Sequence, residues 1–273
     1  MGNVGKRSLW ALIVLVAVLA AAAAAGGADD SDAAVTNGNI NDTGGAGIGT
    51  WSYDDSTNYL TLTFTSSVQP AALDGFTHAS DTVRVIVKGN NLNISTALTA
   101  LSVPPSADLL YQGDIPQITN CAGGVWTYDV SEKTITLTRT SSGTWYGLYN
   151  AYTSSSAHTM WYDMFFKGDV EKAVIDGYQT AGRYIFNDFK GLKTVESSSM
   201  KDFDREMFQY TSVKNISFTN LVTLNADRLN GLESLETVNL PSATAVNDRA
   251  FSGCKSLTAP CSAILSESGT VLS

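Results

Sequence analysis

The sequence of 273 residues is poor in histidine, cysteine and charge. Two histidines and three cysteines, with no C-x-x-C pair, leave few ligands for a zinc site. Charged residues make up 16% of the chain, and 17 basic against 26 acidic residues give a net charge of -9. Nucleic-acid binding depends on clustered basic residues that displace counterions from phosphates. We therefore expect no nucleic-acid partner, no metal and no cofactor.

The motifs of several common enzyme classes are also missing. The chain contains no G-x-S-x-G, H-E-x-x-H or G-x-x-x-x-G-K sequence. A serine or cysteine nucleophile would need His78 or His158 as its base, and both lie in stretches typical of solvated loops. Asp202, Asp204 and Glu206 lie close together, which leaves a carboxylate glycoside hydrolase as the enzymatic alternative. We expect a protein that is not an enzyme.

The N-terminus resembles an export signal. Lys6 and Arg7 precede an uncharged, mostly apolar run over residues 8–28. This pattern predicts a signal peptide over residues 1–28, and an uncleaved membrane anchor is the alternative. Residues 29–48 are rich in Asp, Asn, Gly and Ala, which predicts a flexible linker. We therefore expect a secreted or cell-surface protein that meets a membrane only if the N-terminal segment is not cleaved.

A segment after the linker is duplicated. WSYD at 51–54 recurs as WTYD at 126–129, and LTLT at 60–63 recurs as ITLT at 135–138. Each copy alternates large apolar with small polar residues around a polar turn, a pattern that predicts a half-buried β-hairpin. A later strand-like segment is also repeated, at 83–89 and 171–177. We predict a first β module over 49–120, which ends in a degenerate repeat, and a second over 121–182.

A shorter period follows the second module. Phe186, Phe208, Leu229 and Phe251 recur at steps of 22, 21 and 22 residues. A period of this length indicates a solenoid, in which each turn of chain buries its apolar side against the next. Apolar residues with L-x-x-L-x-L spacing follow each of these positions and suit short strands that point alternate side chains inward. We predict that the solenoid occupies residues 183–273.

The last repeat carries a family resemblance. LETVNLPS at 235–242 and VNDRAFSGCKSL at 246–257 resemble the BspA-type leucine-rich repeat, a class found in microbial surface proteins. The resemblance covers about residues 183–265. Together with the duplication, it implies a mainly β fold, with duplicated β-hairpin modules followed by a short leucine-rich-repeat solenoid with short helical turns. It also implies a surface or secreted protein that acts in protein–protein interaction or adhesion.

The strand face of the solenoid is the predicted partner-binding surface. Residues between the inward apolar positions must point outward, and solenoids use such stacked faces for partners. We expect the partner to be a protein or glycan on another cell or in the matrix. The candidate residues are Lys193, Glu196, Lys214, Ser217, Glu236 and Asn239.

An aromatic block offers an alternative binding site. It includes Trp145, Tyr146 and Trp161. Flat rings can stack on sugars, which would make this segment a carbohydrate-binding module. The rings can also cover the N-terminal end of the solenoid, whose first coil would otherwise expose its core, and we favour this interpretation. Sugar binding stays open as the alternative.

The three cysteines do not make a complete set of disulfides. Cys121, Cys254 and Cys261 are odd in number. Cys254 lies at a repeat turn, where a free thiol packs as a small apolar group. We expect it to be free and structural, and a bond to Cys261 is the alternative.

Overall fold

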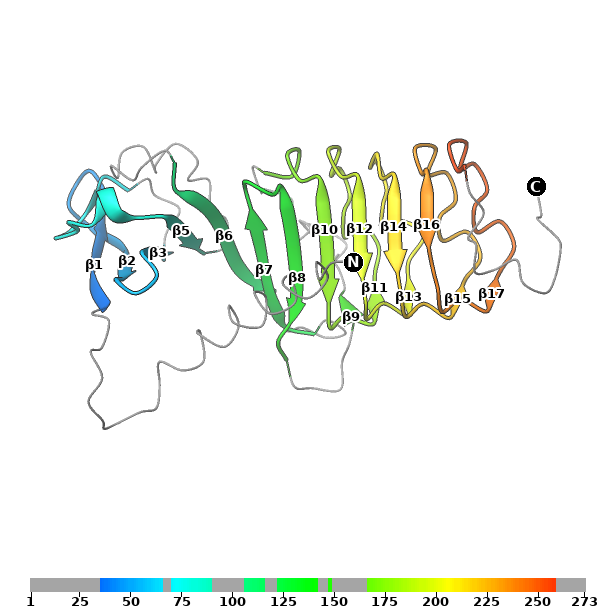
Figure 1. Cartoon of the computed structure of the whole chain (residues 1–273), viewed down its shortest axis with the longest axis horizontal. Coiled ribbons are helices and arrows are strands. Elements are labelled where there is room, and N and C mark those ends of the chain that lie inside the picture. The colour runs from blue at the N-terminus through cyan, green and yellow to red at the C-terminus, as the bar shows by residue number, and fades with distance from the viewer. Residues whose placement is uncertain are drawn as a thin grey trace, which may run out of the picture. The chain divides into compact units, whose positions relative to one another are not determined.

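The computed structural model describes residues 35–65, 70–89, 106–115, 122–141, 147–148 and 166–258 (Figure 1). Residues from Val35 onward form one compact unit. The strands in chain order are β1 (Val35–Asn41), β2 (Gly47–Asp54), β3 (Tyr59–Phe64), β4 (Ala72–Leu73), β5 (Arg84–Lys88), β6 (Asp108–Ile115), β7 (Gly124–Asp129), β8 (Thr134–Arg139), β9 (Gly147–Leu148), β10 (Lys172–Asp176), β11 (Thr180–Ala181), β12 (Thr194–Ser197), β13 (Asp202–Phe203), β14 (Asn215–Phe218), β15 (Thr223–Leu224), β16 (Thr237–Asn239) and β17 (Ala245–Val246).

Twelve of these strands form one sheet in the order β16-β14-β12-β10-β8-β7-β6-β5-β3-β2-β1-β4. β2 and β3 pair antiparallel, and β5 then pairs parallel to β3. The same arrangement recurs when β7 and β8 pair antiparallel and β10 pairs parallel to β8. The duplication seen in the sequence is therefore a duplication of strand topology.

The two copies also place a ring in an equivalent position. In the second copy Phe166 stacks on Tyr128 with ring centroids 4.5 Å apart. In the first copy His78 stacks on Tyr53, also at 4.5 Å. His78 and Phe166 both lie six residues before the parallel strand of their copy. The sequence comparison missed this correspondence because a histidine replaces an apolar ring.

From β10 onward the chain forms repeated coils. β10, β12, β14 and β16 lie side by side and parallel in the large sheet (Figure 1). Each of these strands is followed by a two-residue strand: β11, β13, β15 and β17 in turn. β11 pairs with β13 and with β9, which follows β8, and β15 pairs with β17. Segments with several turns then lead back to the next long strand. This is the geometry of a solenoid.

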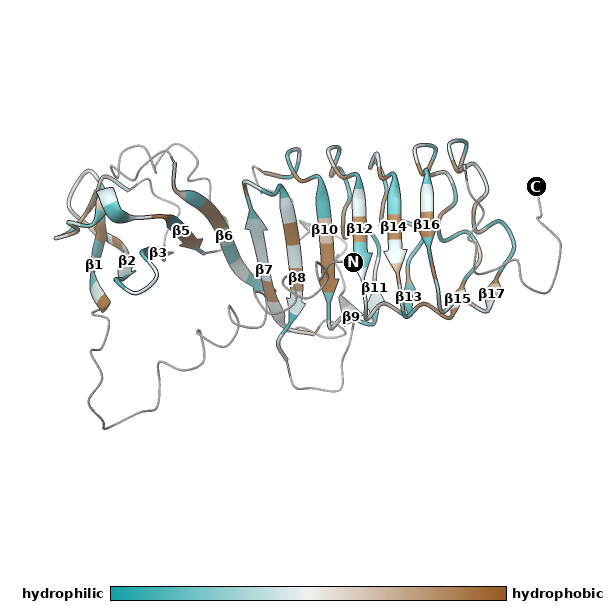
Figure 2. Ribbon diagram, in the orientation of Figure 1, coloured by the Kyte–Doolittle hydropathy of each residue, from teal (hydrophilic) through white to brown (hydrophobic). Residues whose placement is uncertain are grey.

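The inward residues of the repeats form the core. Leu192, Val195, Ile216 and Leu235 are each at most 2% exposed. Figure 2 shows apolar segments recurring at similar positions along β10, β12, β14 and β16. Phe186 and Phe208 stack with centroids 6.2 Å apart, which joins two successive coils. The predicted inward pattern of the solenoid is confirmed.

The predicted helical turns are wrong. Among the described residues the one helical segment is a 3-10 turn at Ala79–Asp81, before the repeats. The returning segment of the first coil places Tyr184 and Asp188 at φ values of 60° and 63°. A residue in this left-handed region interrupts a right-handed helix, so each return is a series of turns.

The two hairpin modules are not confirmed as separate units. β2–β3 and β7–β8 are antiparallel pairs, but six residue pairs also join β6 of the first copy to β7 of the second. Main-chain hydrogen bonds therefore run through both copies and into the repeats. The flexible linker predicted at residues 29–48 is wrong from Val35 onward, because β1 pairs there with β2 in the large sheet and Ile40 is buried. The other domain boundaries proposed from the sequence stay predictions.

Candidate functional site

The predicted strand-face residues lie together on the repeat side of the large sheet. Glu196, Ser217 and Asn239 occupy one row across β12, β14 and β16, because they are register partners. Lys193, Lys214 and Glu236 lie just before these strands. The structure thus brings all six residues onto neighbouring coils, as their spacing of 21 to 22 residues predicts.

Each of these side chains interacts with a neighbouring coil. The ion pairs join Lys193 Nζ to Glu171 Oε2 (2.6 Å), Lys214 Nζ to Glu236 Oε1 (2.7 Å) and Lys172 Nζ to Glu196 Oε2 (2.8 Å). Asn239 Nδ2 donates to Ser217 Oγ at 2.9 Å. The side chains in these ion pairs are between 36% and 52% exposed, so they remain accessible. The face therefore presents a fixed pattern of paired charges and amides.

Glu171 is the centre of this pattern. Its carboxylate accepts hydrogen bonds from Lys133 Nζ at 2.8 Å and Lys193 Nζ at 2.6 Å. These hydrogen bonds, first from Lys133 and then from Lys193, lower the pKa of Glu171 to about 2. Lys133, Glu171 and Lys193 each lie directly before the first residue of a strand, so the carboxylate links the N-terminal ends of β8, β10 and β12. Sequence reasoning missed Glu171, although it precedes Lys193 by one repeat period.

The carboxylates considered for glycoside hydrolysis are held by arginines. Arg228 contacts both carboxylate oxygens of Asp202, at 3.2 and 3.3 Å. Arg183 Nε lies 3.4 Å from Asp204 and 3.7 Å from Glu206. Each of the three carboxylates therefore lies within ion-pair distance of an arginine. The hydrolase alternative stays a prediction.

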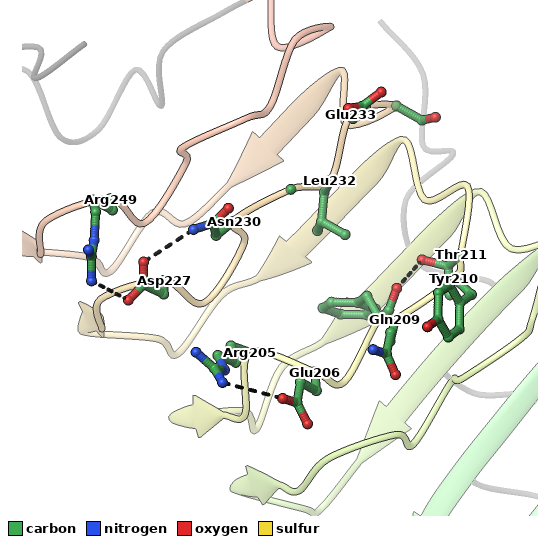
Figure 3. Close-up of a pocket in the computed structure, with 13 residues that line it drawn as sticks. Arg205, Glu206, Gln209, Tyr210, Thr211, Asp227, Asn230, Leu232, Glu233 and Arg249 are labelled. Atoms are coloured by element: carbon green, nitrogen blue, oxygen red, sulfur yellow. Dashed lines mark hydrogen bonds and ion pairs between the residues drawn. The ribbon is translucent and has the colours of Figure 1, made fainter.

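A hollow opens beside Glu206, on the returning side of the coils (Figure 3). It has a volume of about 670 Å³ and is lined by residues of 205–211 and 227–234 and by Arg249. Figure 3 shows Arg249, Asp227 and Asn230 on one side and Gln209 and Tyr210 on the other. One feature of the sequence coincides with the hollow: the segment from Phe208 to Val213 is one residue shorter than the corresponding segments of the other repeats.

The charges in the hollow are paired. Arg249 contacts Asp227 at 2.8 Å and Arg205 contacts Glu206 at 3.5 Å. A hydrogen bond from Asn230, followed by the interaction with Arg249, lowers the pKa of Asp227. The hollow thus holds fixed donors and acceptors with little net charge.

Several predicted residues lie outside the part of the chain that the structure describes. These are the N-terminal signal, the aromatic candidates Trp145, Tyr146 and Trp161, the second histidine His158, and the cysteines Cys121 and Cys261. Cys254 is described, carries a free thiol, and its Sγ donates to the carbonyl of Leu229 at 3.0 Å. Within the described ranges no group of His, Cys, Asp and Glu is arranged to hold a metal ion.

Comparison with protein families agrees with this geometry. Residues 163–258 match the model of the BspA type leucine rich repeat region in six copies. Over these residues the chain is similar to BspA-type leucine-rich repeats. The BspA-type match begins before the predicted start at 183, because β10 already stacks as a repeat strand. No curated protein and no solved structure matches the chain. The described residues include no helix long and apolar enough to cross a membrane.

Proposed function

We propose that this chain is a non-enzymatic, extracellular or cell-surface protein whose BspA-type repeats bind a protein partner through their strand face. The observation that carries the proposal is the set of six predicted residues, which lie on neighbouring coils as one rigid polar pattern. Stacked strands hold such side chains about 4.8 Å apart, so a partner meets fixed positions.

The energetics of the strand face support this role. Exposed ion pairs contribute little to folding stability, about 0 to 1 kcal/mol each. The Lys214–Glu236 pair is about half exposed on both sides, so the core does not depend on it. Charges of this kind act mainly on partner choice and on the rate of association.

The test exchanges charges without removing the pair. Lys214→Glu combined with Glu236→Lys keeps the ion pair but reverses the pattern on the strand face. Lys255→Glu with Glu233→Lys is the matched control, because this 2.7 Å pair lies in turns outside the strand face. The chain and both variants, displayed in many copies, are exposed to cell-surface and matrix extracts, and any retained protein is purified and tested directly.

We expect the purified partner to bind the unchanged chain and the control variant with similar affinity. It should bind the strand-face variant at least tenfold more weakly. Equal binding by all three would refute the strand face as the site. Loss of binding only in the control variant would move the site to the turns.

A further inference from the structure

We infer that the hollow at residues 205–211 and 227–234 binds a neutral sugar, with the ring of Tyr210 as its stacking surface. This site is separate from the strand face and does not rest on the function proposed for it. It also differs from the aromatic block predicted from the sequence, because none of its residues belongs to that block.

The first observation is the backbone of Tyr210. Its φ is 59°, in the left-handed region that residues with a large side chain avoid. The equivalent positions in the preceding coil and in the next two coils are Asp188, Gly231 and Gly253, with φ values of 63°, 79° and 78°. Glycine adopts this conformation without steric cost, and aspartate tolerates it better than most residues do. A tyrosine at this position needs an explanation other than local folding.

The ring does not contribute to the core. Tyr210 is 68% exposed, whereas its neighbour Phe208 is 1% exposed. The aromatic side chain therefore combines an unfavourable backbone conformation with little burial. Strained residues cluster at binding sites, where the surrounding structure maintains them for a function.

The surroundings of the ring suit a sugar. Sugars have apolar C–H faces that cover aromatic rings and hydroxyl groups that need fixed polar partners. Gln209, Thr211 and Asn230 line the same hollow and supply amide and hydroxyl groups. A volume of about 670 Å³ lies within the usual range for small-molecule sites.

Charge balance favours a neutral ligand. Arg205 and Arg249 are each paired with a carboxylate that also lines the hollow. A third carboxylate, Glu233, pairs with Lys255 at 2.7 Å. No cation among the described lining residues is left over for an anionic group, so a sulfated or phosphorylated ligand would gain little.

The test is a calorimetric titration of the whole chain with maltotriose, cellotriose, mannotriose and N-acetylated chitotriose. At least one of these sugars should bind. Tyr210→Gly removes the ring while suiting the backbone, and should weaken binding about tenfold, the upper end for a stacking contact. Tyr210→Phe keeps the ring and should bind within about threefold of the unchanged chain. Ser234→Trp fills the hollow from its other side and should also prevent binding.

Thermal unfolding confirms that each variant is folded before it is titrated. The inference is overturned if none of the four sugars binds, or if Tyr210→Gly and Ser234→Trp both bind as the unchanged chain does. It is also overturned if the hollow binds only a heparin tetrasaccharide or a peptide, because the ligand would then belong to another class.

Discussion

Substitutions of Tyr210 can measure the free-energy cost of its left-handed backbone conformation separately from the contribution of its side chain. We predict that Tyr210→Gly raises the free energy of unfolding by about 0.5 to 1 kcal/mol, because glycine relieves the left-handed strain. Tyr210→Ala keeps the strain and should give no such gain. Urea denaturation of the three proteins measures this difference. A glycine variant less stable than the alanine variant would contradict the role assigned to φ.

Ser197 is a buried polar residue in the inward row of the repeats. It is 4% exposed, and its hydroxyl donates to the carbonyl of Ile175 at 2.8 Å. The same oxygen accepts from the backbone N–H groups of Ser199 and Met200. We predict that Ser197→Ala costs about 1 to 3 kcal/mol, because these buried groups lose their partner. The measurement is the urea midpoint, with the exposed Ser256→Ala as a control that should change little.

At the scale of elements, Glu171 connects three strands through its ion pairs, and it makes their stability depend on pH. A carboxyl group whose pKa is lowered on folding stabilises the protein above its unfolded pKa and loses that effect as pH falls toward the folded value. With a folded pKa of about 2, the effect is complete above about pH 5 and fades between there and pH 2.

We predict that Glu171→Gln lowers the melting temperature at pH 7, and that the difference from the unchanged chain shrinks as the pH falls toward 2. High salt should reduce the difference at pH 7 because both lysines are exposed. Glu132→Gln, an exposed change in the turn before β8, serves as the control. A difference that is constant over this pH range would exclude the ion pairs as its cause.

Elements were also what the sequence predicted best. The spacing of Val195, Ile216 and Val238 places these residues inward, and all three are buried. The repeated WSYD and WTYD segments each form the first strand of an antiparallel pair. Such patterns are local, so hydrophobic periodicity reveals them.

What the sequence did not predict depends on other coils or on backbone angles. Tyr184 and Tyr210 carry no sequence signature of a left-handed conformation, so helical turns were expected where the chain turns irregularly. The hollow arises from residues of three successive coils, and it becomes visible only when Tyr210 is compared with Gly231. The six strand-face residues were placed together correctly, but their ion pairs with Lys172 and Glu171 were not foreseen.

At the scale of the molecule, one hydrogen-bonded sheet joins both copies of the duplication to the repeats. We predict that the two copies and the repeats unfold in a single transition.

All five tryptophans precede residue 166, so their fluorescence reports on the part before the repeats. Ile216→Ala in β14 should cost about 2 to 5 kcal/mol and shift the tryptophan transition as much as the circular dichroism transition. Leu62→Ala in β3 is the matched change at the other side. Two transitions that move separately would show that the repeats unfold independently of the part before them.

The equal register of neighbouring coils determines what happens when a coil is deleted or inserted. Thr194 pairs with Asn215, and Asn215 pairs with Thr237, so the first residues of successive strands are register partners. Deleting residues 194–214 would place Asn215 directly after Lys193, where it could pair with Lys172 in the same register that Thr194 uses now. Inward residues would still meet inward residues, with Ile216 in the place of Val195. The chain can therefore gain or lose a whole coil, and the coils on either side still pair in register and bury the same face.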